Sequence, residues 1–282
     1  MSDDLVLYDV SDRIATITLN RPDQANAQNF ALLDELDAAW TRAAEDDEVR
    51  VIVLRGNGKH FSSGHDLQAS EARKDGRERE VNAAGLTTTV QRIYTIESQR
   101  YLGYSMKWRN VPKPSIAAVQ GVCIAGGLLL AWPCDLIVAA DDAKFSDPVI
   151  TMGIGGVEYH GHTWELGPRL AKEILFTARA LTAEEARRVG MVNRVVPRDD
   201  LDSATRELAL SIAQHHPYAL RMAKRAVNHT LDVQGFTTAV NAVFEMHQLG
   251  HGNALTESGW PVLVDLEKMK AAQAAREAAK QG

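Results

Sequence analysis

Two hydrophobic patterns of different period follow one another at the start of the chain. Apolar and polar residues alternate in LVLYDV and again in RIATITL, which predicts two strands, and the short stretch 9–12 between them predicts a hairpin. In the next segment, NFALLDELDAAWTRAAEDDEV, apolar residues recur at helical spacing after Asn29, a favourable N-cap residue. The chain is therefore predicted to start with a β-hairpin and an amphipathic helix.

Strands, glycines and helices then alternate as far as residue 140. VRVIVLRG and SIAAVQG have the pattern of buried strands and end in glycine. A long helical stretch up to Trp108 stops at NVPKP, where proline is incompatible with a helix. A helix from about Gly126 precedes the strand CDLIVAA. This order predicts a layered α/β fold and argues against an all-β protein or a helical bundle.

The chain is mostly helical from Thr182 onward. Thr182 and Glu185 in TAEEA predict a capping box, and VNRVVP predicts one last strand. After Asp199, amphipathic helices are expected, with interruptions at Pro217, Gly235, residues 250–252 and Pro261. We therefore divide the chain into a core, residues 1–198, and a C-terminal helical region, residues 199–282.

Two segments carry little hydrophobic pattern. Residues 70–80, SEARKDGRERE, are nearly all charged, and we expect a solvated loop there. The Ala-rich end, residues 266–282, is expected to be a polar helix or a frayed tail.

The composition narrows the class of protein. Lys and Arg number 31 and Asp and Glu number 37, so the net charge of −6 argues against binding nucleic acid or an anionic membrane. Cys123 and Cys134, the two cysteines, lie in apolar segments and are expected to be small buried residues. No secretion signal or membrane-spanning run is evident, so we expect a cytoplasmic protein.

Two glycine turns follow predicted strands and are the first sign of chemistry. They are KHFSSGHDL, residues 59–67, and VCIAGGLLL, residues 122–130. Backbone N–H groups that point out of such turns can donate to an anion without a side chain in the way. Two converging N–H groups form an oxyanion hole, which stabilises the negative oxygen of a carbonyl.

Five segments resemble the crotonase superfamily of enoyl-CoA hydratases and isomerases in order and spacing. They are NRPDQANAQN, VIVLRGNGKHFSSGHDL, PKPSIAAVQGVCIAGGLLLAWPCDLIVAADDAKFSDP, LTAEEARRVGMVNRVVP and HHPYALRMAKRAVN. The resemblance implies a spiral of ββα units with a helical C-terminal region that builds a homotrimer or a dimer of trimers. It also implies an acyl-CoA thioester substrate, with no metal and no separate cofactor.

The resemblance also implies roles for single residues. The thioester oxygen would accept hydrogen bonds from the backbone N–H groups of His65 and Gly126, and we expect the His65 side chain to contribute nothing further. Asp66 is expected to hold its loop. The residues expected around the substrate and its CoA portion are Asn26, Ser63, Gly64, Asp66, Leu67, Leu129 and Val149.

The sequence departs from the family at the two glutamates that activate water in typical hydratases. Leu129 and Val149 occupy those positions, and neither can move a proton. Glu158 is our first candidate for a replacement acid or base, with a pKa raised by burial, and the alternative for it is a helix-start role. His160 is a weaker candidate.

Other possibilities stay open at this point. His160 and His162 without further ligands are a weak metal pair. The reaction is either hydration, isomerisation or another enolate reaction. A non-catalytic acyl-CoA binding protein is the alternative from another class, because both hydratase glutamates are missing.

Overall fold

The structure is a computed structural model that describes residues 4–67, 89–258 and 261–264. The predictions for residues 70–80 and 266–282 lie outside these described residues. None of the helices within them has both the length and the apolar character that a membrane crossing requires.

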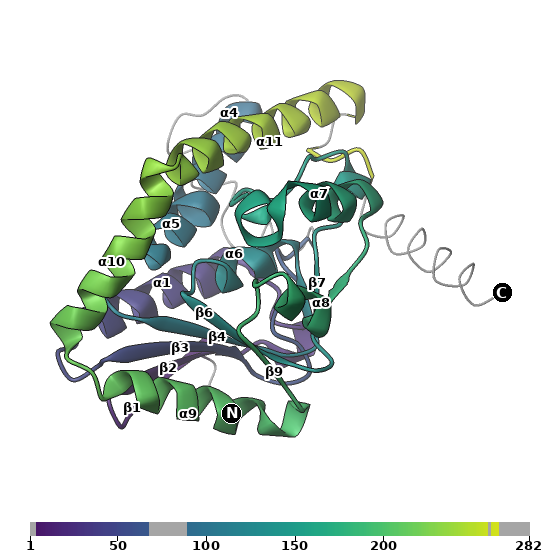
Figure 1. Ribbon diagram of the computed structural model, residues 1–282. Helices are drawn as coiled ribbons and strands as arrows, with labels where there is room; N and C mark the ends of the chain where they lie inside the picture. The colour runs from purple at the N-terminus through teal and green to yellow at the C-terminus, as the bar shows by residue number, and fades with distance from the viewer. Residues whose placement is uncertain (1–3, 68–88, 259–260, 265–282) are drawn as a thin grey trace.

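A six-stranded sheet forms the centre of the described molecule (Figure 1). Its strands follow the order β1-β2-β3-β4-β6-β9, with β1 antiparallel to β2 and every later neighbour parallel. The β1-β2 hairpin and the strands predicted from VRVIVLRG, SIAAVQG, CDLIVAA and VNRVVP are confirmed. The strands are β1 (Val6–Ser11), β2 (Ile14–Leu19), β3 (Val51–Gly56), β4 (Ser115–Val119), β6 (Leu136–Ala140) and β9 (Arg194–Val196).

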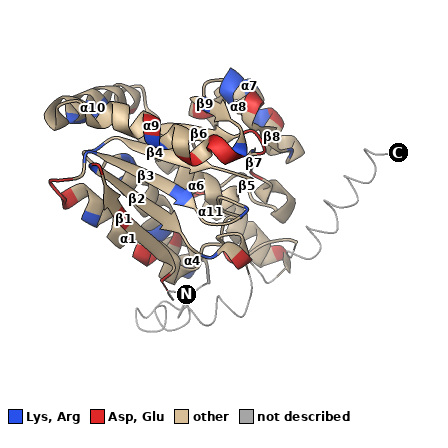
Figure 2. Cartoon of the chain, turned by 90° about the horizontal axis from the view of Figure 1, so that it is seen from below, with Lys and Arg blue, Asp and Glu red and all other residues tan. Residues whose placement is uncertain are grey.

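Helices cover both faces of this sheet, as its apolar strands require. Alternate residues of the central strands, such as Ile52 and Leu54, pack with Trp40 and other residues of helix α1 (Phe30–Glu45). The residues between them, such as Val53, pack with Ala209 and other residues of helix α9 (Leu201–Ala213). Figure 1 shows α1 and α9 on opposite sides of the sheet. The strands are mostly uncharged, whereas charged residues gather on the helices (Figure 2).

A small second sheet lies next to the first and carries one of the glycine turns. Its order is β5-β7-β8, with β5 (Val122–Ile124) parallel to β7 (Lys144–Ser146) and β8 (Leu181–Thr182) antiparallel to β7. Cys123 in β5 is fully buried and Cys134 nearly so, which confirms that both thiols are small core residues.

The local helix signals are confirmed. The Asn29 side chain accepts a hydrogen bond from the N–H of Leu32 at 2.9 Å, and Thr182 and Glu185 form a reciprocal capping box. The helical stretch before NVPKP consists of three pieces, the middle one a π-helix. They are α4 (Thr89–Ile96), η2 (Glu97–Gly103) and α5 (Tyr104–Arg109).

The remaining helices fall into two groups by length. The short ones are η1 (Pro22–Gln24), η3 (Ala125–Gly127), α6 (Leu128–Ala131), η4 (Val149–Met152) and η5 (Arg198–Asp200). The longer ones are α7 (His162–Thr177), α8 (Ala183–Arg188), α10 (Pro217–Val233) and α11 (Phe236–Ser258).

One predicted interruption is wrong. Helix α11 runs without a break through Gly250 and Gly252. Glycine in a helix costs only about 1 kcal/mol, and packing offsets this cost. A Cβ atom on Gly250 would lie 3.1 Å from Ile154 Cδ1, so the glycine allows α11 to approach the loop before α7 closely.

Candidate functional site

The two glycine turns pack directly on each other. Ser62 donates its N–H to Val122 O at 3.1 Å, and Ile124 donates its N–H to Ser62 O at 3.0 Å. Gly64 has a φ of +89°, and a Cβ atom there would lie 2.7 Å from Ile124 O and 3.0 Å from Gly126 N. Only glycine fits this contact, which brings the N–H groups of residues 65 and 126 side by side.

The N–H groups of His65 and Gly126 remain available to a ligand. Gln28 pairs with the carbonyl of Gly64 and the N–H of Asp66, so the N–H of His65 points away from this pairing. Within the described residues it donates to no backbone carbonyl. Gly126 lies in the first turn of η3, where N–H groups have no acceptor in the helix. Two donors without a backbone acceptor are what the oxyanion hole expected from the sequence requires.

The side chain of His65 extends from the glycine turn that carries its backbone N–H group and contacts Glu158. His65 Nε2 lies 3.2 Å from Glu158 Oε1, and the imidazole stacks on the Tyr101 ring with 3.8 Å between centroids. Glu158 is buried, in the loop before α7. The side chain of His65 therefore contacts the candidate acid or base directly, so a role beyond that of its amide is structurally available.

The charge state of Glu158 also differs from the expectation. Burial raises the pKa of its carboxyl group, but the charges of His65 and His247 lower it by more, so the pKa lies below its usual range. The sequence predicts a raised pKa because Glu158 stands among glycines and apolar residues, whereas both histidines that lower the pKa come from distant segments. The carboxylate form is favoured, which suits a base.

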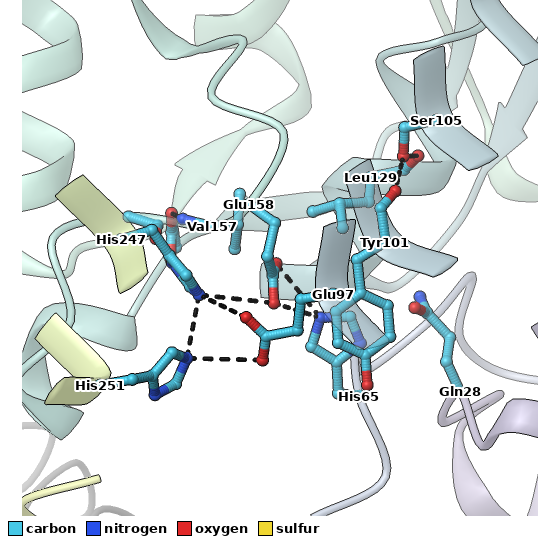
Figure 3. A network of polar contacts seen from close by, with 12 residues as sticks. Gln28, His65, Glu97, Tyr101, Ser105, Leu129, Val157, Glu158, His247 and His251 are labelled. Carbon is cyan, nitrogen blue, oxygen red and sulfur yellow. Dashed lines mark hydrogen bonds and ion pairs between the residues drawn. The ribbon is translucent and has the colours of Figure 1, made fainter. Parts of the chain in front are cut away.

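Three further residues continue the polar network on the other side of Glu158 (Figure 3). His247 Nε2 lies 3.7 Å from Glu158 Oε1 and 3.3 Å from Glu97 Oε2, and His251 Nε2 lies 3.5 Å from Glu97 Oε1. Burial lowers the pKa of His247, but the carboxylates of Glu158 and Glu97 and the carbonyl of Gly156 raise it to about 9.

The π-helix η2 supplies two of the residues around this network. Glu97 is its first residue and Tyr101 lies within it. Segments of π-helix occur frequently at functional sites. Here the segment directs Glu97 to the histidines of α11 and Tyr101 to the ring of His65.

Leu129 and Val149, which the family resemblance places at the hydratase glutamate positions, are packing residues. Leu129 lies in α6 with 2% of its surface exposed, and its carbonyl accepts a hydrogen bond from the Ser105 hydroxyl at 3.0 Å. Val149 starts η4 and packs half-buried against the core. Neither position offers an acid or a base.

The loops around the oxyanion hole are held by buried polar contacts. Arg21 Nη1 lies 3.0 Å from Asp66 Oδ2, so Asp66 anchors its loop. Asn26 donates from Nδ2 to Asn57 O at 3.0 Å and accepts the N–H of Arg21 at 2.9 Å. Since Asn26 is fully buried by these contacts, it positions the loops and does not line the site with its side chain, contrary to the expectation.

The other residues expected near the substrate differ in exposure. Gly64 is buried and Ser63 half-buried, and Ser63 donates its N–H to Ala25 O at 2.9 Å. Leu67 has 45% of its surface exposed at the edge of the described residues, where it is free to contact a ligand.

His160 does not join Glu158 and His65. Its ring packs against His162, with 4.5 Å between centroids, and burial lowers its pKa to about 4. His162 Nε2 lies 3.0 Å from Asp147 Oδ2. Among the described residues, no contact of the His160 side chain with His65 or Glu158 is found, so the geometry does not support it as an acid or base.

Glu97, Gln28, His247 and His251 were missed by the sequence analysis. Two histidines four residues apart on one helix face, as in HQLGH, are a recognisable ligand spacing that could have indicated His247 and His251. Glu97 and Gln28 have no such signal. The Gln28 side chain lies against Gly126, where a Cβ atom would be 3.0 Å from its Oε1 atom.

Comparisons with known proteins agree with this geometry. A family model described as Enoyl-CoA hydratase/isomerase matches residues 9–259. The Mycobacterium tuberculosis protein EchA13, an enoyl-CoA hydratase by name, is 42% identical over 257 residues, or 88% of this chain and 81% of its own.

Two solved structures are similar over nearly their whole length. They are crystal structures of a probable enoyl-CoA hydratase from Mycobacterium smegmatis and of one from Mycobacterium thermoresistibile. Each is 69% identical, with a TM-score of 0.84, and the match covers 91% of this chain and 98% of the other.

Proposed function

Because the chain belongs to the enoyl-CoA hydratase/isomerase (crotonase) family, we propose that it forms a thioester enolate held by the N–H groups of His65 and Gly126. The family acts on acyl-CoA substrates. The two N–H groups come from adjacent turns, and within the described residues neither donates to a backbone carbonyl. Hydrogen bonds from such fixed donors stabilise an enolate oxygen more than the neutral thioester, which lowers the barrier to removing an α-proton.

Glu158 is the base in this proposal. The single observation that carries it is the contact of 3.2 Å between its carboxylate and His65 Nε2, because His65 also supplies an oxyanion N–H. The imidazole orients the carboxylate and stabilises its charge. A proton taken from the substrate by Glu158 can return to another carbon of the same substrate.

Double-bond isomerisation is the reaction that this site supports best. Isomerisation needs one base that moves a proton between two carbons, whereas hydration in the family uses two glutamates to hold and activate water. The family resemblance assigns those two positions to Leu129 and Val149, which support the proposal because neither can move a proton. A site with one buried carboxylate beside the oxyanion hole therefore favours proton transfer within the substrate.

The proposal is tested with wild-type protein and the Glu158→Gln variant on Δ2-enoyl, Δ3-enoyl, β-hydroxyacyl and saturated acyl-CoA thioesters in D2O. Mass spectrometry follows both product formation and exchange of the α-proton for deuterium. We expect wild-type protein to exchange and isomerise, and Glu158→Gln to lose about 10²-fold or more of both rates.

The control is Glu207→Gln, which changes an exposed glutamate on α9 and should keep the wild-type rates. Equal thioester binding by all three proteins with no exchange in any of them would refute catalysis and favour the non-catalytic acyl-CoA binding protein. Exchange that persists undiminished in Glu158→Gln would remove Glu158 from the mechanism.

Assembly into a homotrimer or a dimer of trimers belongs to the same proposal. Large apolar side chains are exposed on the last two described helices, namely Tyr218, Val227, Val233, Met246 and Leu249. Burial of such side chains against neighbouring copies is favourable. Light scattering after size-exclusion chromatography should give three or six times the mass of one chain, and a monomer would refute this part.

A further inference from the structure

A group of three possible metal ligands lies behind Glu158. Glu97 on η2 and His247 and His251 on α11 each direct one ligand atom into the same space, and these atoms lie within 4.8 Å of one another. The two histidines are one helical turn apart, so their rings leave the same face of α11. Figure 3 shows the three side chains converging.

The hydrogen bonds of the two imidazoles fix where their protons lie. Nδ1 of His247 is 2.6 Å from Gly156 O, and Nδ1 of His251 is 2.6 Å from Pro261 O. A carbonyl oxygen only accepts, so each Nδ1 must carry a hydrogen. In a neutral imidazole the other nitrogen then has none. When both rings are neutral, both Nε2 atoms are therefore acceptors with free lone pairs, whereas the raised pKa of His247 favours a proton on that ring when no ion is bound.

These lone pairs face each other and two carboxylates. His247 Nε2 lies 3.0 Å from His251 Nε2, 3.3 Å from Glu97 Oε2 and 3.7 Å from Glu158 Oε1. Acceptors packed this closely repel one another unless a cation lies between them. Either a proton shared between the two Nε2 atoms or a bound metal ion removes this repulsion.

The distances match a metal ion. Zn²⁺ binds nitrogen and oxygen ligands at about 2.0–2.1 Å in a tetrahedron, whose corners are then about 3.3 Å apart. His247 Nε2 lies 3.0 Å from His251 Nε2 and 3.3 Å from Glu97 Oε2, whereas His251 Nε2 lies 3.5 Å from the other carboxylate oxygen, Glu97 Oε1. With one ligand atom from each residue, the three atoms lie within 4.8 Å of one another, so a rotation of the Glu97 carboxylate would bring one oxygen to both imidazoles.

The surroundings of the ligands are also typical of a metal site. Histidine ligands commonly donate their second ring N–H to a backbone carbonyl, and ligating carboxylates accept further hydrogen bonds. Both features are present, because Gly156 O and Pro261 O accept from the imidazoles, and Gln248 Nε2 donates to Glu97 Oε2 at 2.7 Å.

We propose that Glu97, His247 and His251 form a binding site for a divalent transition-metal ion, with Zn²⁺ as the best match to two imidazoles and one carboxylate. The two positive charges of this ion balance the negative charges of the Glu97 and Glu158 carboxylates. The site joins η2 to α11, and it stands whether or not the proposed isomerisation is correct.

The test measures metal on the full chain purified without a polyhistidine tag. After dialysis against metal-free buffer and addition of Zn²⁺, elemental analysis should find about one zinc ion per chain. Co²⁺ added to the metal-free protein should give the intense visible absorption of tetrahedral cobalt. Both readouts are independent of enzymatic activity and need no variant.

Two variants locate the ion. His251→Gln should weaken Zn²⁺ binding by at least about tenfold, because a ligand is lost. His229→Gln removes an exposed imidazole on α10 and should bind as wild type does. The proposal is overturned if wild type binds no more Zn²⁺ or Co²⁺ than His251→Gln, in which case a shared proton joins the two imidazoles.

Discussion

The Nε2 atom of His65 lies 3.2 Å from the Oε1 atom of Glu158, although 93 residues separate the two along the chain. In the proposed mechanism, His65 acts on the thioester in two ways. Its backbone N–H donates to the thioester oxygen, and its imidazole orients Glu158, which is the base. A change that moves this ring should affect both functions. The stacking partner of the ring, Tyr101, offers a way to test this.

Replacement of Tyr101 separates the effect of its ring from that of its hydroxyl. Tyr101→Leu removes the surface on which the His65 imidazole stacks, with 3.8 Å between centroids, so we expect kcat to fall by about tenfold or more. Tyr101→Phe keeps the ring and should retain most of kcat. Steady-state kinetics on whichever thioester of the panel is turned over measures both variants, and a loss in Tyr101→Phe as large as that in Tyr101→Leu would instead assign the role to the hydroxyl.

Gly126→Ala should disable the oxyanion hole. The added Cβ atom would lie 2.8 Å from His65 Cε1 and 2.9 Å from His65 Nδ1, so the turn or the ring must shift. Loss of one oxyanion donor costs about 10²-fold to 10³-fold in kcat.

The matched control for this variant is Gly252→Ala in α11, where a new Cβ atom meets nothing within 4 Å. It should keep activity and gain up to about 1 kcal/mol in free energy of unfolding. Wild-type kcat in Gly126→Ala would contradict the assignment of this N–H to the oxyanion hole.

A glutamate at residue 129, the position that the resemblance assigns to a hydratase glutamate, should destabilise the protein. Leu129 is almost fully buried among apolar side chains, and Leu129→Glu places a carboxyl group there with no cation beside it. We expect the free energy of unfolding to fall by about 3 kcal/mol or more.

Leu129→Met conserves the volume and should cost less than about 1.5 kcal/mol. Urea unfolding followed by circular dichroism measures both variants. Equal stability of Leu129→Glu and wild type would mean that water reaches this position, and hydration would again be a candidate reaction.

The stability of the fold should depend on pH through Glu165 on α7. This residue is partly exposed as a whole, but burial of its carboxyl group raises the pKa to about 7, from 4.5. The folded chain therefore binds a proton that the unfolded chain releases near its lower pKa. The resulting stability is fully present below the unfolded pKa and is lost as pH rises through about 7.

Glu165→Gln cannot ionise, so its stability relative to wild type should increase between about pH 5 and about pH 8. Unfolding midpoints at both pH values measure the difference, with Glu207→Gln as the exposed control. A difference between Glu165→Gln and wild type that does not change with pH would show that the carboxyl group is well solvated.

The sequence alone predicted those features that depend on neighbouring residues. The alternating strands, the N-cap Asn29 and the capping box at Thr182 follow from local periods and hydrogen-bonding side chains, and the structure confirms them. The glycine turns were found because a strand ending in glycine is visible in a single stretch of sequence.

The parts that the sequence did not reveal depend on how distant elements face each other. HQLGH in α11 fits an amphipathic helix, and only the packing of this helix turns His247 and His251 toward Glu97. The π-helical turn at Glu97 has no recognisable residue pattern. The pKa of Glu158 was predicted in the wrong direction for the same reason, because both of its histidine neighbours come from far along the chain.

The position of His247 in α11 has a consequence for synthesis of the protein. The loops of the oxyanion hole are complete once residue 127 has left the ribosome, but the network behind Glu158 needs a helix that is made more than a hundred residues later. A nascent chain that ends before α11 has His65 available to Glu158 but lacks His247 and the core residues Phe236, Val240 and Phe244. Completion of the site and completion of the core therefore depend on the same late helix.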